Sequence, residues 1–438
     1  MRVLGLEMKK IINSYAIWGF LLVCILFNVV LILSIGIDPY ADYVKKVSVH
    51  TGLQLGERFN QKLTAFVQGE NLKNDNSEQL VSETNETETN FLQNEDQKQY
   101  NQEQLASETN ETEANLSQKE SQKWRNSEQF YQESLIQETT EVSDVFDGYD
   151  TGKIADTYVQ TFRLKGKLAE NMRNKYADLQ KIADEKGKHD DSLSLYFAGS
   201  TYGQHHKLFF SVMRSIIIEG VLLSVLIVLF SIGYENSNRI EDIVYSSKAG
   251  RPIVMKKLIA VVVTGIFFYL LLLGASLGLY FSVNDYSGIW QSNVSSSFNG
   301  IGDIIMGFRP FLTWHNFTVL SYLFATIGVS LILILCFSLM GFVAGICIRN
   351  SYVGFFALFF VNALLVTVTA ILPPDSYFLF TLMLSPICLL IKQPVWFTDG
   401  GFDILWKNFE IRGVGASVVV MAIIVVVAAI KFRKREII

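Results

Sequence analysis

The chain has 438 residues, half of them hydrophobic, and a formal net charge of −5, which is too apolar for an ordinary soluble protein. Residues 38–207 carry 30 acidic and 19 basic side chains, net −11, whereas the remaining residues carry 12 and 18, net +6, so an acidic soluble block interrupts a mildly basic membrane part. All four cysteines lie in apolar segments, which excludes a disulfide-stapled acidic block.

Six segments are long and apolar enough to cross a membrane as helices. A span needs about twenty apolar residues, and its backbone must be helical because lipid offers no hydrogen-bond partner. The segments are residues 15–37, 212–233, 258–282, 318–345, 352–372 and 413–430. We therefore predict an all-α polytopic membrane protein with six transmembrane helices. Residues 1–37 form the cytoplasmic N-terminus and the first transmembrane helix, which we interpret as retained rather than cleaved.

Residues 38–207 are predicted to form an acidic, helical extracytoplasmic domain inserted between the first and second spans. "SEQLVSETNETETN" begins at Ser77 and "QEQLASETNETEAN" at Gln102, so the repeat period is 25 residues. Seven helical turns take about 25 residues, so each copy presents the same face, as in a coiled coil. A disordered low-complexity stretch is the alternative, because the composition is polar and poor in aliphatic residues. A second helical stretch, Ile154 to Lys186, is expected to return towards the membrane.

Residues 208–438 are predicted to form a five-helix transmembrane domain. Between its first two helices lies a polar stretch with helical spacing, "RIEDIVYSSKAGR". Its apolar residues follow the i, i+3, i+4 pattern of one helix face: Ile240, Ile243 and Val244. Glu241 and Asp242 occupy other faces in the first turn, where acidic groups suit the helix dipole. The pattern predicts a short amphipathic helix at about residues 237–249.

The segment at about residues 375–392 is apolar but too short to cross a membrane. It contains "YFLFTLMLSPICLLI", is interrupted by Pro386, and is flanked by further prolines. A re-entrant pair of helices on the outer side is our interpretation, and an amphipathic segment lying on the membrane face is the alternative.

The distribution of Lys and Arg predicts the orientation. With the N-terminus in the cytoplasm, thirteen basic residues fall on the inside and four in the two short outer loops. We therefore predict a multi-pass cell-membrane protein with both termini cytoplasmic and residues of about 38–207 extracytoplasmic.

The sequence contains no catalytic or metal-binding pattern that we can argue for. It has no G-x-x-x-x-G-K-[ST] loop, no H-E-x-x-H and no paired-cysteine spacing. We expect no catalytic residue, no metal site and no cofactor bound by this chain. Glu219 lies within the second span, where an ionisable group is costly and tends to face protein or water. It is a candidate functional residue together with Arg214, and a structural hydrogen bond from Glu219 to another span is the alternative.

The stretch between the second and third spans resembles the coupling region of the permease subunits of type-2 ATP-binding-cassette (ABC) exporters. The matching residues, in order, are Glu235, Ile243, Ser246, Ser247, Lys248, Gly250, Arg251 and Lys257. Arg239 stands where that family usually has a glycine, and the outer block is longer than in its minimal members. The resemblance implies a cytoplasmic coupling helix that a separate ATPase subunit receives in a surface groove.

The resemblance also implies the site and the partners. The ATPase-coupling residues would be Glu235, Ile240, Glu241, Asp242, Ile243, Val244, Lys248, Gly250 and Arg251. Lys248 and Arg251 would contact lipid phosphates or close the helix end, or would only anchor the segment at the interface. The partners would be a cytoplasmic ABC ATPase, a second permease copy or paralogue and membrane lipid, with no nucleic acid; ATP would act only through the ATPase. The substrate would be hydrophobic or amphipathic: a peptide antibiotic, a lipid or a drug. A membrane-anchored sensor or interaction protein that uses its helical outer domain is the alternative function.

Overall fold

The computed structural model describes residues 2–36, 39–70, 127–137, 139, 146–188, 205–238, 240, 244, 253–286, 289–295, 300–348 and 350–434. By its contacts the chain divides into two units. The first, the helix unit, comprises Met1–Ile37, Asp144–Ser192 and Gly203–Ile438, and the second comprises Asp38–Ser143 and Leu193–Tyr202. Asp144–Ser192, which lies within the predicted outer domain of residues 38–207, belongs to the helix unit. The predicted repeats lie outside the described residues, as does most of the predicted coupling helix.

Each predicted span corresponds to a helix that is long and apolar enough to cross a membrane, which confirms these six elements within the described residues. The helices are α2 (Tyr15–Ile35), α9 (Met213–Ser237), α11 (Ile253–Val283), α12 (Val319–Cys347), α13 (Ser351–Ile371) and α16 (Phe409–Lys434). A π-helical turn, η3 (His206–Val212), runs directly into α9. Four of them, α9, α11, α12 and α16, are longer than the predicted apolar runs. The apolar run marks only the part of a helix that would lie in lipid, and polar residues at its ends can continue the same helix.

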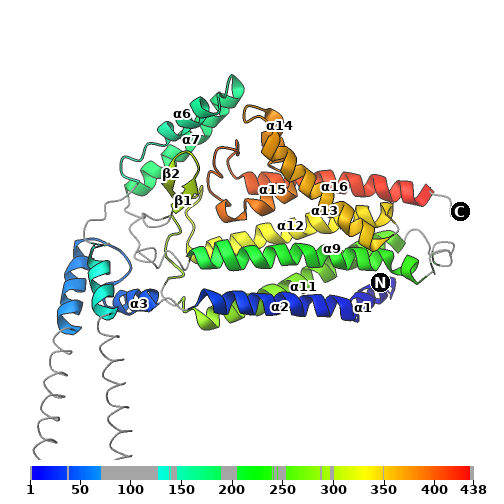
Figure 1. The fold of residues 1–438 in the computed structure, drawn as a ribbon, viewed down its shortest axis with the longest axis horizontal. Helices are drawn as coiled ribbons and strands as arrows, with labels where there is room; N and C mark the ends of the chain where they lie inside the picture. Colours follow the sequence, from blue (N-terminus) through cyan, green and yellow to red (C-terminus); the bar gives the residue numbers. More distant parts are fainter. Residues whose placement is uncertain are drawn as a thin grey trace, which may run out of the picture. The chain divides into compact units, whose positions relative to one another are not determined.

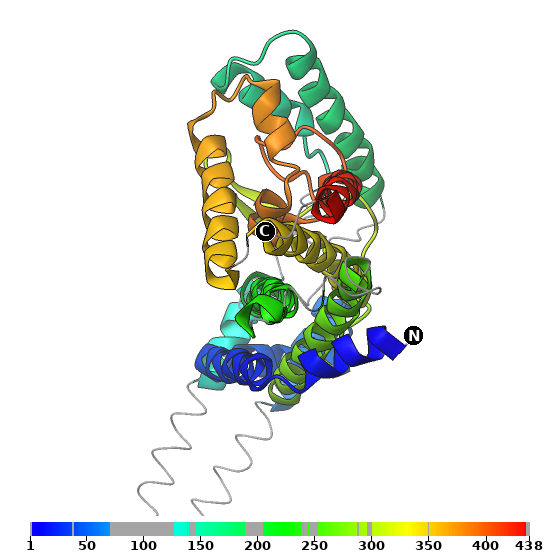
Figure 2. The same cartoon turned by 90° about the vertical axis from the view of Figure 1, so that its right-hand side faces the viewer.

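Helices α9 and α12 lie at the centre of the helix unit (Figures 1 and 2). Helix α9 packs against α2, α11, α12 and α13, while α12 also packs against α16. The apolar stretch from η3 through α9 is 78% buried, whereas that of α13 is 11% buried and so forms an outer face. Gly220 permits one close approach, because a Cβ there would collide with the Tyr269 ring of α11.

Both ends of the helix unit carry additional elements. Helix α1 (Arg2–Ile12) packs against α9 and α11, at the same end as the C-terminus of α16 (Figure 1). At the opposite end, β1 (Gly300–Asp303) and β2 (Gly307–Pro310) form an antiparallel hairpin in which Ile301 pairs with Arg309. The hairpin was not predicted, since strands of four residues with Gly and Pro lack the alternation by which strands are recognised.

The predicted apolar segment at about 375–392 forms two short helices. They are α14 (Tyr377–Leu382) and α15 (Pro386–Ile391), followed by a 3₁₀ turn, η4 (Gln393–Val395). Pro386 begins α15 at a position where its missing N–H needs no partner. The segment is therefore a pair of short helices, and its re-entrant placement on the outer side stays a prediction.

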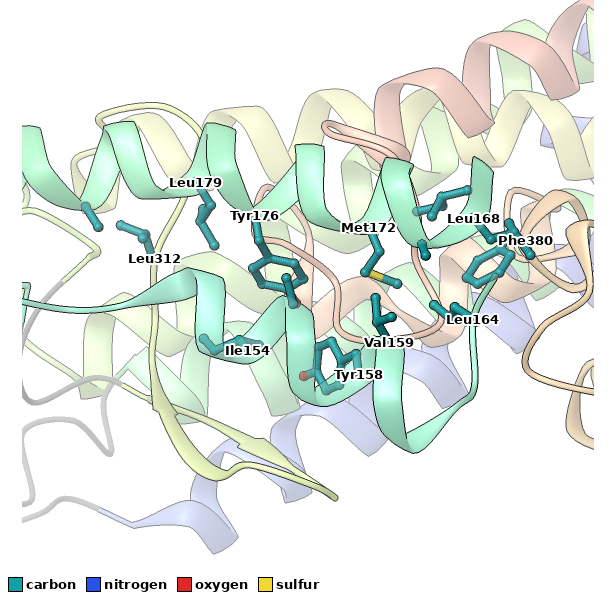
Figure 3. Close-up of a cluster of buried hydrophobic side chains, with 14 of the residues drawn as sticks. Ile154, Tyr158, Val159, Leu164, Leu168, Met172, Tyr176, Leu179, Leu312 and Phe380 are labelled. Carbon is teal, nitrogen blue, oxygen red and sulfur yellow. The ribbon is translucent and has the colours of Figure 1, made fainter. Parts of the chain in front are cut away.

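The predicted second helical stretch, Ile154 to Lys186, contains two helices, α6 (Thr151–Thr161) and α7 (Lys167–Gly187), which form a helical hairpin. The helices are separated at Arg163 and Gly166, whose φ values are +52° and +56°. Left-handed backbone cannot continue an α-helix. Between the two helices lies a hydrophobic core that includes Tyr158, Met172 and Tyr176 (Figure 3). The same core includes residues from outside the hairpin: Leu312, Trp314, Phe380 and Leu405. Full burial of a large apolar side chain contributes about 1.5–3 kcal/mol, so this core also holds the hairpin to the rest of the helix unit.

The second unit, described by itself, is also mostly helical in its described residues. It contains α3 (Pro39–Thr51) and helical residues 57–70 and 127–137.

Candidate functional site

The predicted coupling residue Glu235 lies in a buried ionic cluster, the Glu235 cluster, formed by Glu7, Lys10, Glu235 and Lys257. Lys257 donates to the Glu235 carboxylate and, over 3.1 Å, to the Ser231 carbonyl one turn earlier. Lys10 of α1 reaches the other Glu235 oxygen at 3.1 Å and Glu7 at 2.8 Å. Glu235 is 4% exposed and Lys257 is fully buried, so both charges depend on these partners.

The positions of the two central charges explain why they need each other. Glu235 lies in the last turn of α9, and Lys257 follows the start of α11 by one turn. Each charge is at the helix end whose dipole disfavours it, so pairing offsets an unfavourable interaction on both sides. The pair also joins the two helices that flank the predicted coupling segment.

Of residues 239–252, the structure describes only Ile240 and Val244. The N–H of Ile240 donates to the Glu235 carbonyl at 3.0 Å, and the N–H of Val244 donates to the Ile240 carbonyl at 3.0 Å. The second bond has the i to i+4 spacing of an α-helix. The other predicted coupling residues, Glu241, Asp242, Ile243, Lys248, Gly250 and Arg251, lie outside the described residues.

The second predicted site residue, Glu219, belongs to a polar cluster inside the helix unit, the Glu219 cluster, with Asn28, Ser215 and Ser276. The Asn28 side-chain amide of α2 donates to Glu219 of α9 at 2.6 Å and to Ser276 of α11 at 3.1 Å. Ser215 donates to the other Glu219 oxygen at 3.3 Å. Asn28 is fully buried and Glu219 is 9% exposed. The cluster therefore links three helices, which is the structural role that sequence left open for Glu219.

Arg214 does not join this cluster. It lies in the first turn of α9 and forms no ion pair with any residue that the structure describes. Its five-residue separation from Glu219 places the two side chains on different faces of the helix.

A third cluster, which sequence reasoning missed, attaches the α6–α7 hairpin to the loops at the far end of the bundle. This Asp399 cluster comprises Tyr158, Lys175, Tyr176, Asp303, Arg309 and Asp399. The Arg309 guanidinium lies between two carboxylates, 3.2 Å from Asp399 and 3.3 Å from Asp303. Tyr176 donates to Asp399, and Tyr158 donates to Asp303.

Lys175 completes the Asp399 cluster. Its ammonium donates to three backbone carbonyls of the loop that precedes α16: Asp399 at 3.2 Å, Gly401 at 3.0 Å and Ile404 at 2.7 Å. Burial lowers the pKa of Lys175 to about 8. Burial also opposes ionisation of Asp399, but Arg309 and Lys175 outweigh it and hold the Asp399 pKa at about 2.

The sequence contains no local pattern from which the Asp399 cluster could be predicted. Arg309 and Asp399 are isolated charges in aromatic loops ninety residues apart, and no local spacing relates them. The fold alone brings them together. Within the described residues, no group of three or more His, Cys, Asp or Glu could hold a metal ion.

Comparison with protein-family models, with curated proteins and with solved structures gives no match for this chain. Its function must therefore be inferred from its own residues.

Proposed function

We propose that this chain is the membrane-spanning permease subunit of an ATP-driven ABC exporter. A separate cytoplasmic ATPase hydrolyses ATP, and the permease moves a hydrophobic or amphipathic substrate across the membrane. The observation that carries the proposal is the Glu235–Lys257 ion pair, which joins the ends of α9 and α11 on either side of the coupling motif.

The geometry of this pair supports a mechanical role for the segment between the two helices. A force on residues 239–252 reaches α9 through the backbone and α11 through the backbone and the buried pair. Packed helices respond by moving between discrete arrangements rather than by bending continuously. Helix α9 packs against four other apolar helices of the described bundle, so its displacement would move the centre of the bundle.

The proposal includes an orientation. The Glu235 cluster and both chain termini lie on the cytoplasmic side, in keeping with the excess of Lys and Arg in those segments. The β-hairpin, α14 and α15 then lie on the outer side, together with the α6–α7 hairpin. A partner permease, a second copy or a paralogue, would complete the substrate path.

Affinity purification of the tagged full chain from its native membranes tests the proposal. The retained proteins are digested and identified by mass spectrometry, and ATP hydrolysis by the eluate is measured. A stoichiometric ATPase carrying a G-x-x-x-x-G-K-[ST] loop supports the proposal. An eluate of this chain without such an ATPase and without ATP hydrolysis contradicts it.

A further inference from the structure

A cavity of about 300 Å³ adjoins the Asp399 cluster, at the end of the bundle opposite α1. It lies between the β-hairpin, the end of α15 and the loop before α16. Five charged residues contribute to its wall: Asp303, Arg309, Lys392, Asp399 and Asp403. Its volume is at the lower limit of small-ligand sites, about 300–1,000 Å³. The occupant must therefore be small.

The wall retains a donor and an acceptor that the protein itself does not use. They do not come from Arg309, which is 5% exposed and whose guanidinium is buried against Asp399 and Asp303. Lys392 donates to Asp403 Oδ1 at 2.6 Å and to the Gly400 carbonyl at 3.3 Å, which leaves one of its three protons. The other oxygen of Asp403 accepts from no described residue. The Lys392–Asp403 pair thus offers a donor and an acceptor side by side.

Charge balance narrows the chemistry of the ligand. Three acidic side chains of the wall face Arg309 and Lys392 in the wall and the buried Lys175 behind it. The site is therefore neutral, and a ligand with a single charge would leave that charge uncompensated beside the buried Arg309 and Asp399, which is costly. A zwitterion satisfies the free donor and the free acceptor without changing the charge balance of the site.

The remaining wall includes four aliphatic side chains. Ile301, Ile304, Ile391 and Val395 contribute to it, and they suit an apolar side chain. We propose that this cavity binds an aliphatic α-amino acid as its zwitterion. The ligand ammonium would contact Asp403, and the ligand carboxylate would contact Lys392. This inference does not depend on an ATPase partner, so it can fail or succeed independently of the exporter function.

The test is equilibrium binding to the purified full chain in detergent, measured by calorimetry. The ligands are L-leucine, 4-methylpentanoate, which lacks the ammonium group, and 3-methylbutylamine, which lacks the carboxylate. We expect saturable binding of leucine, with each single-charge analogue at least about tenfold weaker, the effect of losing a hydrogen bond to a charged group. Absence of saturable leucine binding overturns the proposal, as does equal affinity for either analogue.

Variants identify the site. Lys392→Gln and Asp403→Asn should each weaken leucine binding at least about tenfold. The matched control is Lys181→Gln, which breaks the exposed Lys181–Asp178 pair of α7 and should leave the affinity unchanged. Ile304 is 92% exposed, so Ile304→Ser threatens folding least; it should weaken leucine binding while leaving glycine binding unchanged. Equal effects of Lys181→Gln and Lys392→Gln, or an unchanged affinity in Lys392→Gln, Asp403→Asn and Ile304→Ser, would overturn the assignment.

Discussion

Glu235 and Lys257 form a buried ion pair between the last turn of α9 and the start of α11. The two residues enclose the polar segment whose sequence resembles a coupling helix. Lys10 of α1 completes the arrangement by contacting the same carboxylate. One acidic side chain thus joins three helices at this end of the bundle, which makes it the first position to test.

Removal of one partner of this pair should destabilise the protein strongly. Glu235→Gln leaves the fully buried Lys257 without a compensating charge, at a cost of about 3–5 kcal/mol. Thermal unfolding of the full chain in detergent should show a large fall in Tm. The double variant Glu235→Leu with Lys257→Met should recover most of it, because no unpaired charge remains. If the loss of stability in the double variant equals the sum of the losses in its two single variants, the pairing is contradicted.

The Glu219 cluster makes a separate prediction. Asn28→Leu removes the amide that donates to Glu219 and Ser276, and leaves a Glu219 oxygen buried without a partner. The expected loss is about 1–3 kcal/mol, again measured by thermal unfolding. Ser34→Ala is the control, because the exposed Ser34 hydroxyl bonds only to its own helix. If both substitutions have the same small effect, the Asn28–Glu219 bond does not stabilise the bundle.

Attachment of the α6–α7 hairpin should depend on Tyr176. Tyr176→Phe keeps the ring in the core but removes its hydrogen bond to Asp399, a bond to a charged group worth about 1.5–3 kcal/mol. Hydrogen exchange of the α7 amides should accelerate. Tyr377→Phe is the control, since Tyr377 is 47% exposed. Unchanged exchange in Tyr176→Phe would show that the apolar core alone holds the hairpin.

The same attachment should weaken in acid. The pKa of Asp399 is lowered from 3.8 to about 2 in the folded state. Its stabilising contribution is therefore fully present above pH of about 4 and is lost as the pH falls towards 2. The expected loss of stability is about 2 kcal/mol. It is measured as the protection of the α7 amides from hydrogen exchange at a series of pH values. Asp399→Asn should be less stable near neutral pH and should lack this part of the acid dependence; an acid profile identical to that of the wild type would exclude Asp399 as its source.

Sequence predicted the elements that depend on local pattern and missed those that depend on the fold. Twenty or so consecutive apolar residues specify a span by themselves, so all six helices were found. The break at Arg163 and Gly166 was missed, because a single glycine in a charged stretch is a weak signal. The Asp399 cluster could not be found, since Lys175, Arg309 and Asp399 come from three segments that only tertiary contacts unite. Conversely, Glu235 was predicted from a motif, but its buried pairing with Lys10 required the structure.

The most direct test of the exporter proposal is whether an ATPase remains attached when the coupling segment is altered. The tagged wild type, Ile243→Arg and the control Val49→Arg, whose side chain is 78% exposed on α3, are purified in parallel from native membranes. ATP hydrolysis is then measured per mole of this chain. We expect ATPase activity with the wild type and Val49→Arg, and its loss with Ile243→Arg, because a charge on the apolar face should disrupt docking in a groove. Equal ATP hydrolysis in all three samples, or none with the wild type, would contradict the account.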